Sequence, residues 1–122
     1  MRPKTNAFMP PHNMKLSGIH VTGLPDVAIW EVAQNTMRDE PGRHTIYARA
    51  DVPVEQFHKQ ELKAIRDDQP FARHTSVVGW PAMADVNECK ERWKEICLAL
   101  SESPAVTLSI PSVPIRLEPN KP

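Results

Sequence analysis

The sequence predicts an α/β or compact α+β fold in a single domain, with about four strands covered by two to three helices. Segments in which apolar and polar residues alternate, as in strands, are interspersed along the chain with segments whose apolar residues recur at the helical period. The 122 residues are 40% apolar, which is enough for one core. Thirteen prolines gather largely toward the two ends and indicate extended chain there. We therefore expect an extended N-terminal arm over 1–14, the domain over 15–110 and an extended C-terminal arm over 111–122.

The N-terminal part predicts an arm, a strand and a helix in turn. Residues 1–14 hold three prolines and no sustained period, which indicates an extended arm that Phe8 can anchor. The mostly β-permissive residues 15–22 predict a short strand. Pro25 suits the first turn of a helix, and apolar residues recur at three- and four-residue spacing as far as Met37. This pattern predicts a helix with one buried face.

The middle of the chain predicts two strands and one ambiguous segment. The β-branched and aromatic residues at 45–49 predict a strand, and those at 75–80 predict a second, central strand that Pro81 ends. The segment 53–66 fits one helix, and it fits a short helix followed by extended chain from Leu62 nearly as well. Both alternatives stay open at this point.

The clearest helix of the chain starts near Asp85. Asp85 with Glu88 three residues later has the form of a capping box, and an apolar stripe then reaches Leu100. Residues 105–110 alternate apolar and polar side chains, as a half-buried strand does. The prolines within 111–122 lack the N–H group that a central strand must donate, so this segment is predicted to be extended.

Composition limits the classes of partner. Fifteen basic residues balance fifteen acidic ones, so no overall field attracts the protein to nucleic acid or to an anionic membrane. The first residues lack the apolar run of a signal peptide, and no stretch approaches the roughly 18 apolar residues of a membrane helix. Cys89 and Cys97 lie about 12 Å apart if they share one helix, too far for a disulfide. We expect a cytoplasmic protein with two free thiols and with no membrane or nucleic-acid partner.

Two short repeats supply the candidate catalytic residues His20, His44 and His74. The triplet Arg-His-Thr occurs at 43–45 and again at 73–75, each time directly before a predicted strand. Brought together, these Arg and His side chains can form a cationic pocket for a phosphate or a carboxylate; the alternative is that they cap the strand starts and face solvent. The segments 20–22 and 74–76 each place a hydroxyl two residues after His, which resembles the two-histidine phosphoesterases. That resemblance implies an acid and a base acting on a phosphodiester.

A polar cluster is predicted at one end of the sheet. Arg49 and Asp51 lie two residues apart and share a face if the chain is extended, and Arg73 and His74 begin the neighbouring predicted strand. With Arg43, these four residues are the candidate ligand-binding set. An internal Arg–Asp bridge that fixes the strand end is the alternative.

No metal or cofactor is expected. The His and Cys residues lack the close spacing that preorganises a zinc site, and four glycines form no phosphate-binding loop.

The leading hypothesis for function is protein–protein interaction, as an adaptor, an inhibitor or a subunit. The predicted arms carry apolar residues that suit a partner or a second copy of the chain, as in a homo-oligomer. These candidate interaction residues are Phe8, Val113, Ile115 and Leu117. The alternative is a small phosphate-binding domain or a phosphodiesterase-like enzyme that uses the Arg and His residues.

Several short stretches resemble a family of small bacterial proteins that has no established activity. They are Gly23-Leu24 with Ala28-Ile29-Trp30-Glu31, then Tyr47-Ala48-Arg49-Ala50-Asp51, then Ala72-Arg73-His74 and Gly79-Trp80-Pro81. The resemblance implies a bacterial, cytoplasmic, single-domain protein of the kind carried on phages, cassettes or other mobile elements. It supplies no catalytic residue.

Overall fold

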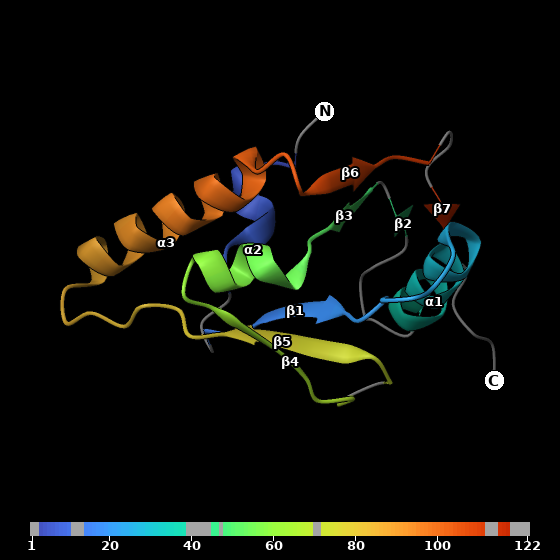
Figure 1. Cartoon of the computed structure of the whole chain (residues 1–122), viewed down its shortest axis with the longest axis horizontal. Helices are drawn as coiled ribbons and strands as arrows, with labels where there is room; N and C mark the ends of the chain where they lie inside the picture. The colour runs from blue at the N-terminus through green and yellow to red at the C-terminus, as the bar shows by residue number, and fades with distance from the viewer. Residues whose placement is uncertain are drawn as a thin grey trace.

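The described part of the chain folds into small antiparallel sheets and helices (Figure 1), which confirms the compact α+β class. The computed structural model describes residues 3–10, 14–38, 45–46, 48–69, 72–111 and 115–117, with the backbone alone at 5–6. In chain order the elements are η1 (Thr5–Phe8), β1 (Leu16–Ile19), α1 (Asp26–Arg38), β2 (Thr45–Ile46), β3 (Arg49–Asp51), α2 (Val54–Lys59), β4 (Lys63–Arg66), β5 (His74–Val78), α3 (Val86–Glu102), β6 (Thr107–Ser109) and β7 (Ile115–Arg116).

Strand β5 is the centre of a three-stranded antiparallel sheet and lies between β1 and β4. Ser76 of β5 is opposite Ser17 of β1 on one side and opposite Ile65 of β4 on the other. Two further antiparallel pairs join β2 to β7 and β3 to β6. The predicted strand at 45–49 therefore corresponds to two strands with different partners. Short strands at 63–66 and 115–116 bring the described strands above the four expected.

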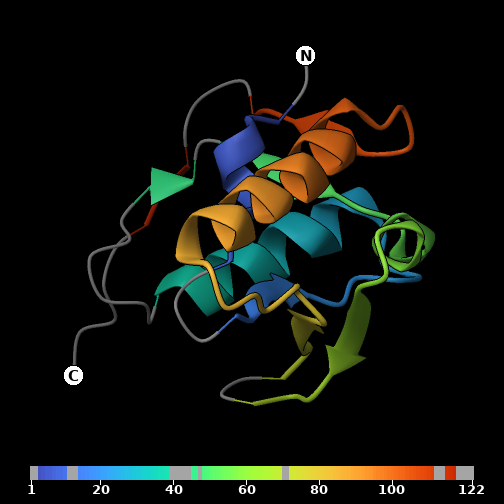
Figure 2. The same ribbon diagram turned by 90° about the vertical axis from the view of Figure 1, so that its left-hand side faces the viewer.

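The hydrophobic core lies between the three-stranded sheet, α2, α3 and η1. Figure 2 shows η1 lying against α3, and Trp80 meets Trp93 of α3 edge to face, with ring centroids 6.4 Å apart. Core packing is thus the role of the apolar stripe on α3, as the sequence predicts. The buried members of this core are Phe8, Phe57, Leu62, Val77, Trp80, Ile96, Cys97, Leu100 and Val106.

The ambiguous segment 53–66 forms a short helix followed by a strand. Helix α2 ends at Lys59 with Gln60 as its C-cap, and Glu61 takes a positive φ of 61°, which turns the chain. Leu62 is then fully buried and β4 begins directly after it. A turn and one core side chain decided between the two alternatives.

The N-terminal arm is corrected where the structure describes it, whereas residues Ile115–Arg116 of the C-terminal arm are extended as predicted. Residues 5–8 form a 3₁₀ turn, and Phe8 is 5% exposed within the core, so this part of the N-terminal arm is packed rather than extended. At the other end, Ile115 pairs with Ile46 between β7 and β2, and Leu117 is also 5% exposed. Burial of apolar side chains outweighs the local preference of a proline-rich segment for solvated, extended chain. Val113 lies outside the described residues.

Candidate functional site

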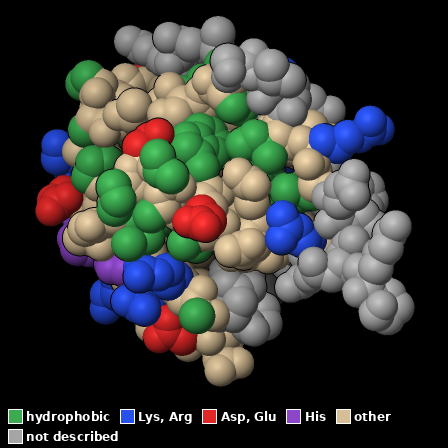
Figure 3. All heavy atoms as spheres, turned by 90° about the vertical axis from the view of Figure 1, so that its right-hand side faces the viewer, with side chains coloured by type: hydrophobic (Ala, Val, Ile, Leu, Met, Phe, Trp, Pro, Cys, Tyr) green, Lys and Arg blue, Asp and Glu red, His purple; other side chains and the backbone are tan. Residues whose placement is uncertain are grey.

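A cleft of about 830 Å³, here called the inner cleft, lies between α1, β1, β5 and the segment 49–57. Most of its lining is apolar and comes from elements far apart in the sequence, as in many small-molecule sites. Helix α1 covers the inner cleft, although none of its residues is fully buried. On this side of the molecule, apolar side chains gather on the surface (Figure 3). The larger apolar lining residues are Phe8, Leu16, Ile29, Met37, Val52, Phe57 and Val77.

The three-stranded sheet has an inner and an outer face. Leu16 and Val77 are opposite one another and pack on the core, so their side chains mark the inner face. Side chains alternate along a strand, which places Ser17, His74 and Ser76 on the outer face. Ser17 and His74 are among the residues that line the inner cleft, but the alternation of side chains along β1 and β5 directs their side chains to the outer face.

Two buried polar atoms of the inner cleft have no hydrogen-bond partner among the described residues. They are Arg49 Nη1 and Thr75 Oγ1. Thr75 points to the inner face opposite Gly18, and a methyl group added to Gly18 would have no atom within 4 Å. The cleft therefore has open space at Gly18, and the unpaired Thr75 hydroxyl is buried on the strand opposite.

Arg49 is held by carboxylates. Its Nη2 lies 2.5 Å from Asp26 Oδ1 and 3.3 Å from Asp51 Oδ2, and its guanidinium stacks 4.6 Å from the centre of the Trp30 ring. The Arg49 side chain is 13% exposed. This is the internal Arg–Asp bridge that the sequence left open as an alternative. The contribution of Asp26 has no sequence signal, because it comes from 23 residues away.

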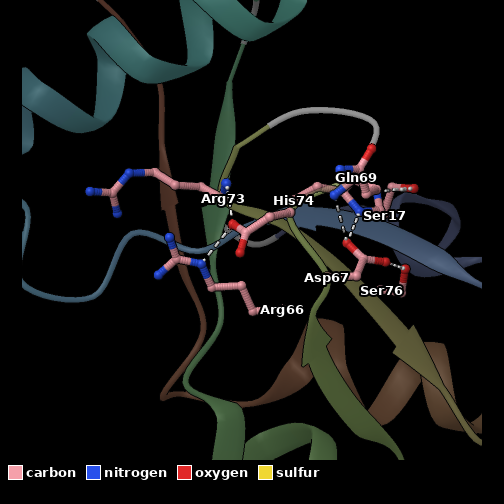
Figure 4. Close-up of polar contacts among 8 residues, drawn as sticks. Ser17, Arg66, Asp67, Gln69, Arg73, His74 and Ser76 are labelled. Carbon is pink, nitrogen blue, oxygen red and sulfur yellow. Dashed lines mark hydrogen bonds and ion pairs between the residues drawn. The ribbon is translucent and has the colours of Figure 1, made fainter.

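A second polar group, here called the outer-face cluster, joins Ser17, Asp67, His74 and Ser76 (Figure 4). His74 Nδ1 lies 2.5 Å from Asp67 Oδ1, and His74 Nε2 lies 3.2 Å from Ser17 Oγ. The Ser76 hydroxyl donates to Asp67 Oδ2 at 2.8 Å. The hydrogen bonds from His74 and Ser76 lower the pKa of Asp67 from 3.8 to about 2.

The turn between β4 and β5 places Asp67 beside His74. The backbone N–H groups of Asp67 and Asp68 both donate to the His74 carbonyl. Asp68 Oδ1 accepts from Arg66 Nε at 2.9 Å and from the Arg73 N–H at 2.8 Å, and these bonds lower the pKa of Asp68. Asp68 and Arg73 take φ values of 54° and 68°, which close the turn. Sequence analysis missed Ser17 and Asp67, since only this turn and the strand pairing bring them to His74.

The predicted catalytic histidines do not share a face where they are described. The His20 N–H donates to the Arg73 carbonyl and continues the β1–β5 ladder by one pair, so His20 points opposite to His74. Arg73 Nη1 donates to the His20 carbonyl at 3.2 Å, which engages its guanidinium with backbone. Arg43 and His44 lie outside the described residues.

Comparisons with protein-family models, curated proteins and solved structures found no match to this chain. The family resemblance and the interaction role therefore stay predictions. Within the described ranges, no helix is long and apolar enough to cross a membrane, and no three His, Cys, Asp or Glu side chains gather as a metal site requires.

Proposed function

We propose that the protein binds a small, mainly apolar molecule in the inner cleft, through an uncharged oxygen of that molecule. The observation that carries this proposal is the pair of unpaired buried atoms, Arg49 Nη1 and Thr75 Oγ1, which both belong to residues that line the cleft. A buried polar group without a partner costs about 1–3 kcal/mol. A ligand oxygen that reaches either buried donor, after a side-chain movement that exposes the donor, removes that cost for it.

The charge around Arg49 supports an uncharged ligand. Arg49 and Asp51 are the charged side chains among the described lining residues, and Asp26 adds a second carboxylate to Arg49. An anion bound at Arg49 would lie beside these two carboxylates, and their repulsion would oppose it. The described charges therefore favour a carbonyl, amide or hydroxyl oxygen over the phosphate that belongs to the alternative reading of the sequence.

Two naphthalene dyes test the choice of ligand. Prodan is uncharged and carries a ketone, whereas 1-anilinonaphthalene-8-sulfonate carries a sulfonate. We expect prodan fluorescence to rise, shift to the blue and saturate with the folded protein, and the sulfonate to bind about tenfold more weakly or less. Tighter binding of the sulfonate, or no binding of prodan, would overturn the proposal.

Two variants locate the dye. Thr75→Val removes the unpaired hydroxyl and keeps the shape of the side chain, so the free energy of unfolding should hold or rise while prodan affinity falls about three- to tenfold. Gly18→Val fills the open space with a residue that suits a strand, so prodan binding should be lost from a stable protein.

Lys63→Thr is the matched control, because it adds a β-branched residue to the outer face of the same sheet. We expect prodan to bind this variant as it binds the unaltered protein. Equal affinity of prodan for all four proteins would place the dye elsewhere and contradict the proposal.

A further inference from the structure

We propose that Ser17 is a nucleophile on the outer face of the sheet, activated by His74 and Asp67, and that it takes the acyl group of an aryl ester. The site is separate from the inner cleft, since the two use opposite faces of β1 and β5. Its basis is the chain of contacts from Ser17 Oγ to His74 Nε2 at 3.2 Å and from His74 Nδ1 to Asp67 Oδ1 at 2.5 Å.

The direction of these hydrogen bonds follows from the carboxylate. Asp67 is ionised at neutral pH, because its pKa is about 2, and a carboxylate only accepts hydrogen bonds. His74 Nδ1 must then carry a proton, and in the singly protonated imidazole Nε2 is the acceptor toward the Ser17 hydroxyl. A base that faces a hydroxyl and is oriented by a third group is the arrangement that activates a serine.

The base of this cluster, His74, is buried, whereas the hydroxyl group of Ser17 is accessible. The His74 side chain is 8% exposed, and the Ser76 hydroxyl holds Asp67 in place by donating a hydrogen bond to its second carboxylate oxygen. Ser17, in contrast, is exposed on β1, at the edge of the described sheet. A reagent can therefore reach the hydroxyl while the imidazole keeps its orientation.

The backbone supplies one donor for the negative charge that develops on the ester oxygen. Hydrogen-bonded pairs alternate along an antiparallel ladder. The pair His20–Arg73 is bonded, so Gly18–Thr75 is bonded next and the Ser17 N–H points away from β5, toward the edge of the described sheet. The amide of the nucleophile itself is one of the two oxyanion donors in serine proteases.

This geometry selects the class of ester. With one oxyanion donor and an exposed nucleophile, the site provides little binding energy for the transition state. The leaving group must depart without much assistance, as a phenolate does. Aryl esters with a small acyl group meet both conditions.

The reaction exchanges one ester bond for another. Ser17 Oγ forms a bond to the carbonyl carbon as its proton passes to His74 Nε2. The bond from that carbon to the aryl oxygen breaks, and either the phenol leaves with the proton returned by His74, or the phenolate leaves as the free anion and His74 gives its proton to solvent. Water, deprotonated by the same nitrogen, then attacks the acyl group and restores the Ser17 hydroxyl as the carboxylic acid leaves.

Incubation with p-nitrophenyl acetate tests the proposal on the full chain. We expect a burst of p-nitrophenolate, one added acetyl group by intact mass, and its location on Ser17 by peptide mapping. Ser17→Ala should abolish the burst, and His74→Gln and Asp67→Asn should slow it at least about tenfold. Ser109→Ala, a serine of β6 outside the cluster, is the control and should leave the burst unchanged.

Acetyl groups on lysines alone, or the same burst in Ser17→Ala, would overturn the proposal. Ser17→Cys gives a second readout that needs no ester. We expect iodoacetamide to alkylate Cys introduced at 17 about tenfold faster than in the double variant Ser17→Cys, His74→Gln. Equal rates would show that His74 does not activate position 17. Either failure leaves the inner-cleft proposal intact, because the prodan experiment reads the other face.

Discussion

The carboxylate of Asp67 joins the turn after β4 to strand β5. One oxygen lies on His74 and the other accepts from Ser76, so the ionised form gains partners that it lacks in the unfolded chain. Its folded pKa is about 2 against 3.8 for the free group. A depressed carboxylate pKa means that this contribution to stability is full above the unfolded value and is lost as the pH falls through the folded value.

We therefore predict that the free energy of unfolding falls between about pH 4 and pH 2, and that Asp67→Asn makes this fall shallower. Asn has no carboxyl group to protonate in that range. Urea unfolding at a series of pH values measures it. Glu102→Gln is the control, since Glu102 is exposed and its side chain has no hydrogen bond among the described residues. The same slope in Asp67→Asn and in the unaltered protein would contradict the assignment.

At the scale of elements, the two long helices have different roles: α3 packs in the core and α1 lines the inner cleft. Helix α3 buries Ile96, Cys97 and Leu100 in the core, and burial raises the pKa of the Cys97 thiol to about 11. Helix α1 has no fully buried residue and instead presents Ile29 and Met37 to the inner cleft. The helix with the weaker packing is thus the one that can adjust around a ligand.

The start of α3 gives a prediction for that element. Asp85 Oδ1 accepts from the Glu88 N–H at 3.0 Å, which confirms this half of the predicted capping box. Asp85→Ala should lower the free energy of unfolding by about 1 kcal/mol, because the N–H loses its acceptor. Asp85→Asn keeps a capping oxygen and should lose only a fraction of that, as measured by urea unfolding. An equal loss in both variants would contradict a role in capping.

At the scale of the whole molecule, the N-terminal segment belongs to the core. Phe8 lies among residues of α2, α3 and β5, although it comes from a segment that the sequence predicts as an extended arm. A partner would have to remove this side chain from the core before it could bind it.

We predict that Phe8→Ala lowers the free energy of unfolding by about 3–5 kcal/mol, because it leaves a cavity in the core. Val27→Ala is the control. Val27 is 78% exposed on α1, so its loss should change the free energy by at most about 0.5 kcal/mol. Thermal or urea unfolding compares the two. If Phe8→Ala were as stable as the unaltered protein, Phe8 would be free for a partner, as the interaction hypothesis requires.

Sequence patterns were sufficient for the elements whose local signals agree with one another. The periodic helices at 26–38 and 86–102 and the strand at 74–78 lie close to their predicted ranges. In each, the spacing of apolar residues and a capping or stop residue point to the same structure. The α+β class follows from these elements.

The sites depended on pairing that the sequence does not encode locally. Arg49 and Asp51 are close in sequence and were predicted together, whereas Asp26 reaches Arg49 only once α1 has packed. Ser17 reaches His74 from 57 residues away. Such contacts depend on strand register, which a single sequence does not fix.

The sequence by itself determined the class of fold, the main helices and the Arg49–Asp51 alternative, because these depend on neighbours a few residues apart. The tertiary structure alone decided that Phe8 joins the core, that His20 and His74 face opposite sides of the sheet, and that Ser17 and Asp67 converge on His74. The reason is physical. A shift of one residue in strand pairing moves every side chain of that strand to the opposite face of the sheet. The pairing register is set by which side chains are buried across the whole molecule.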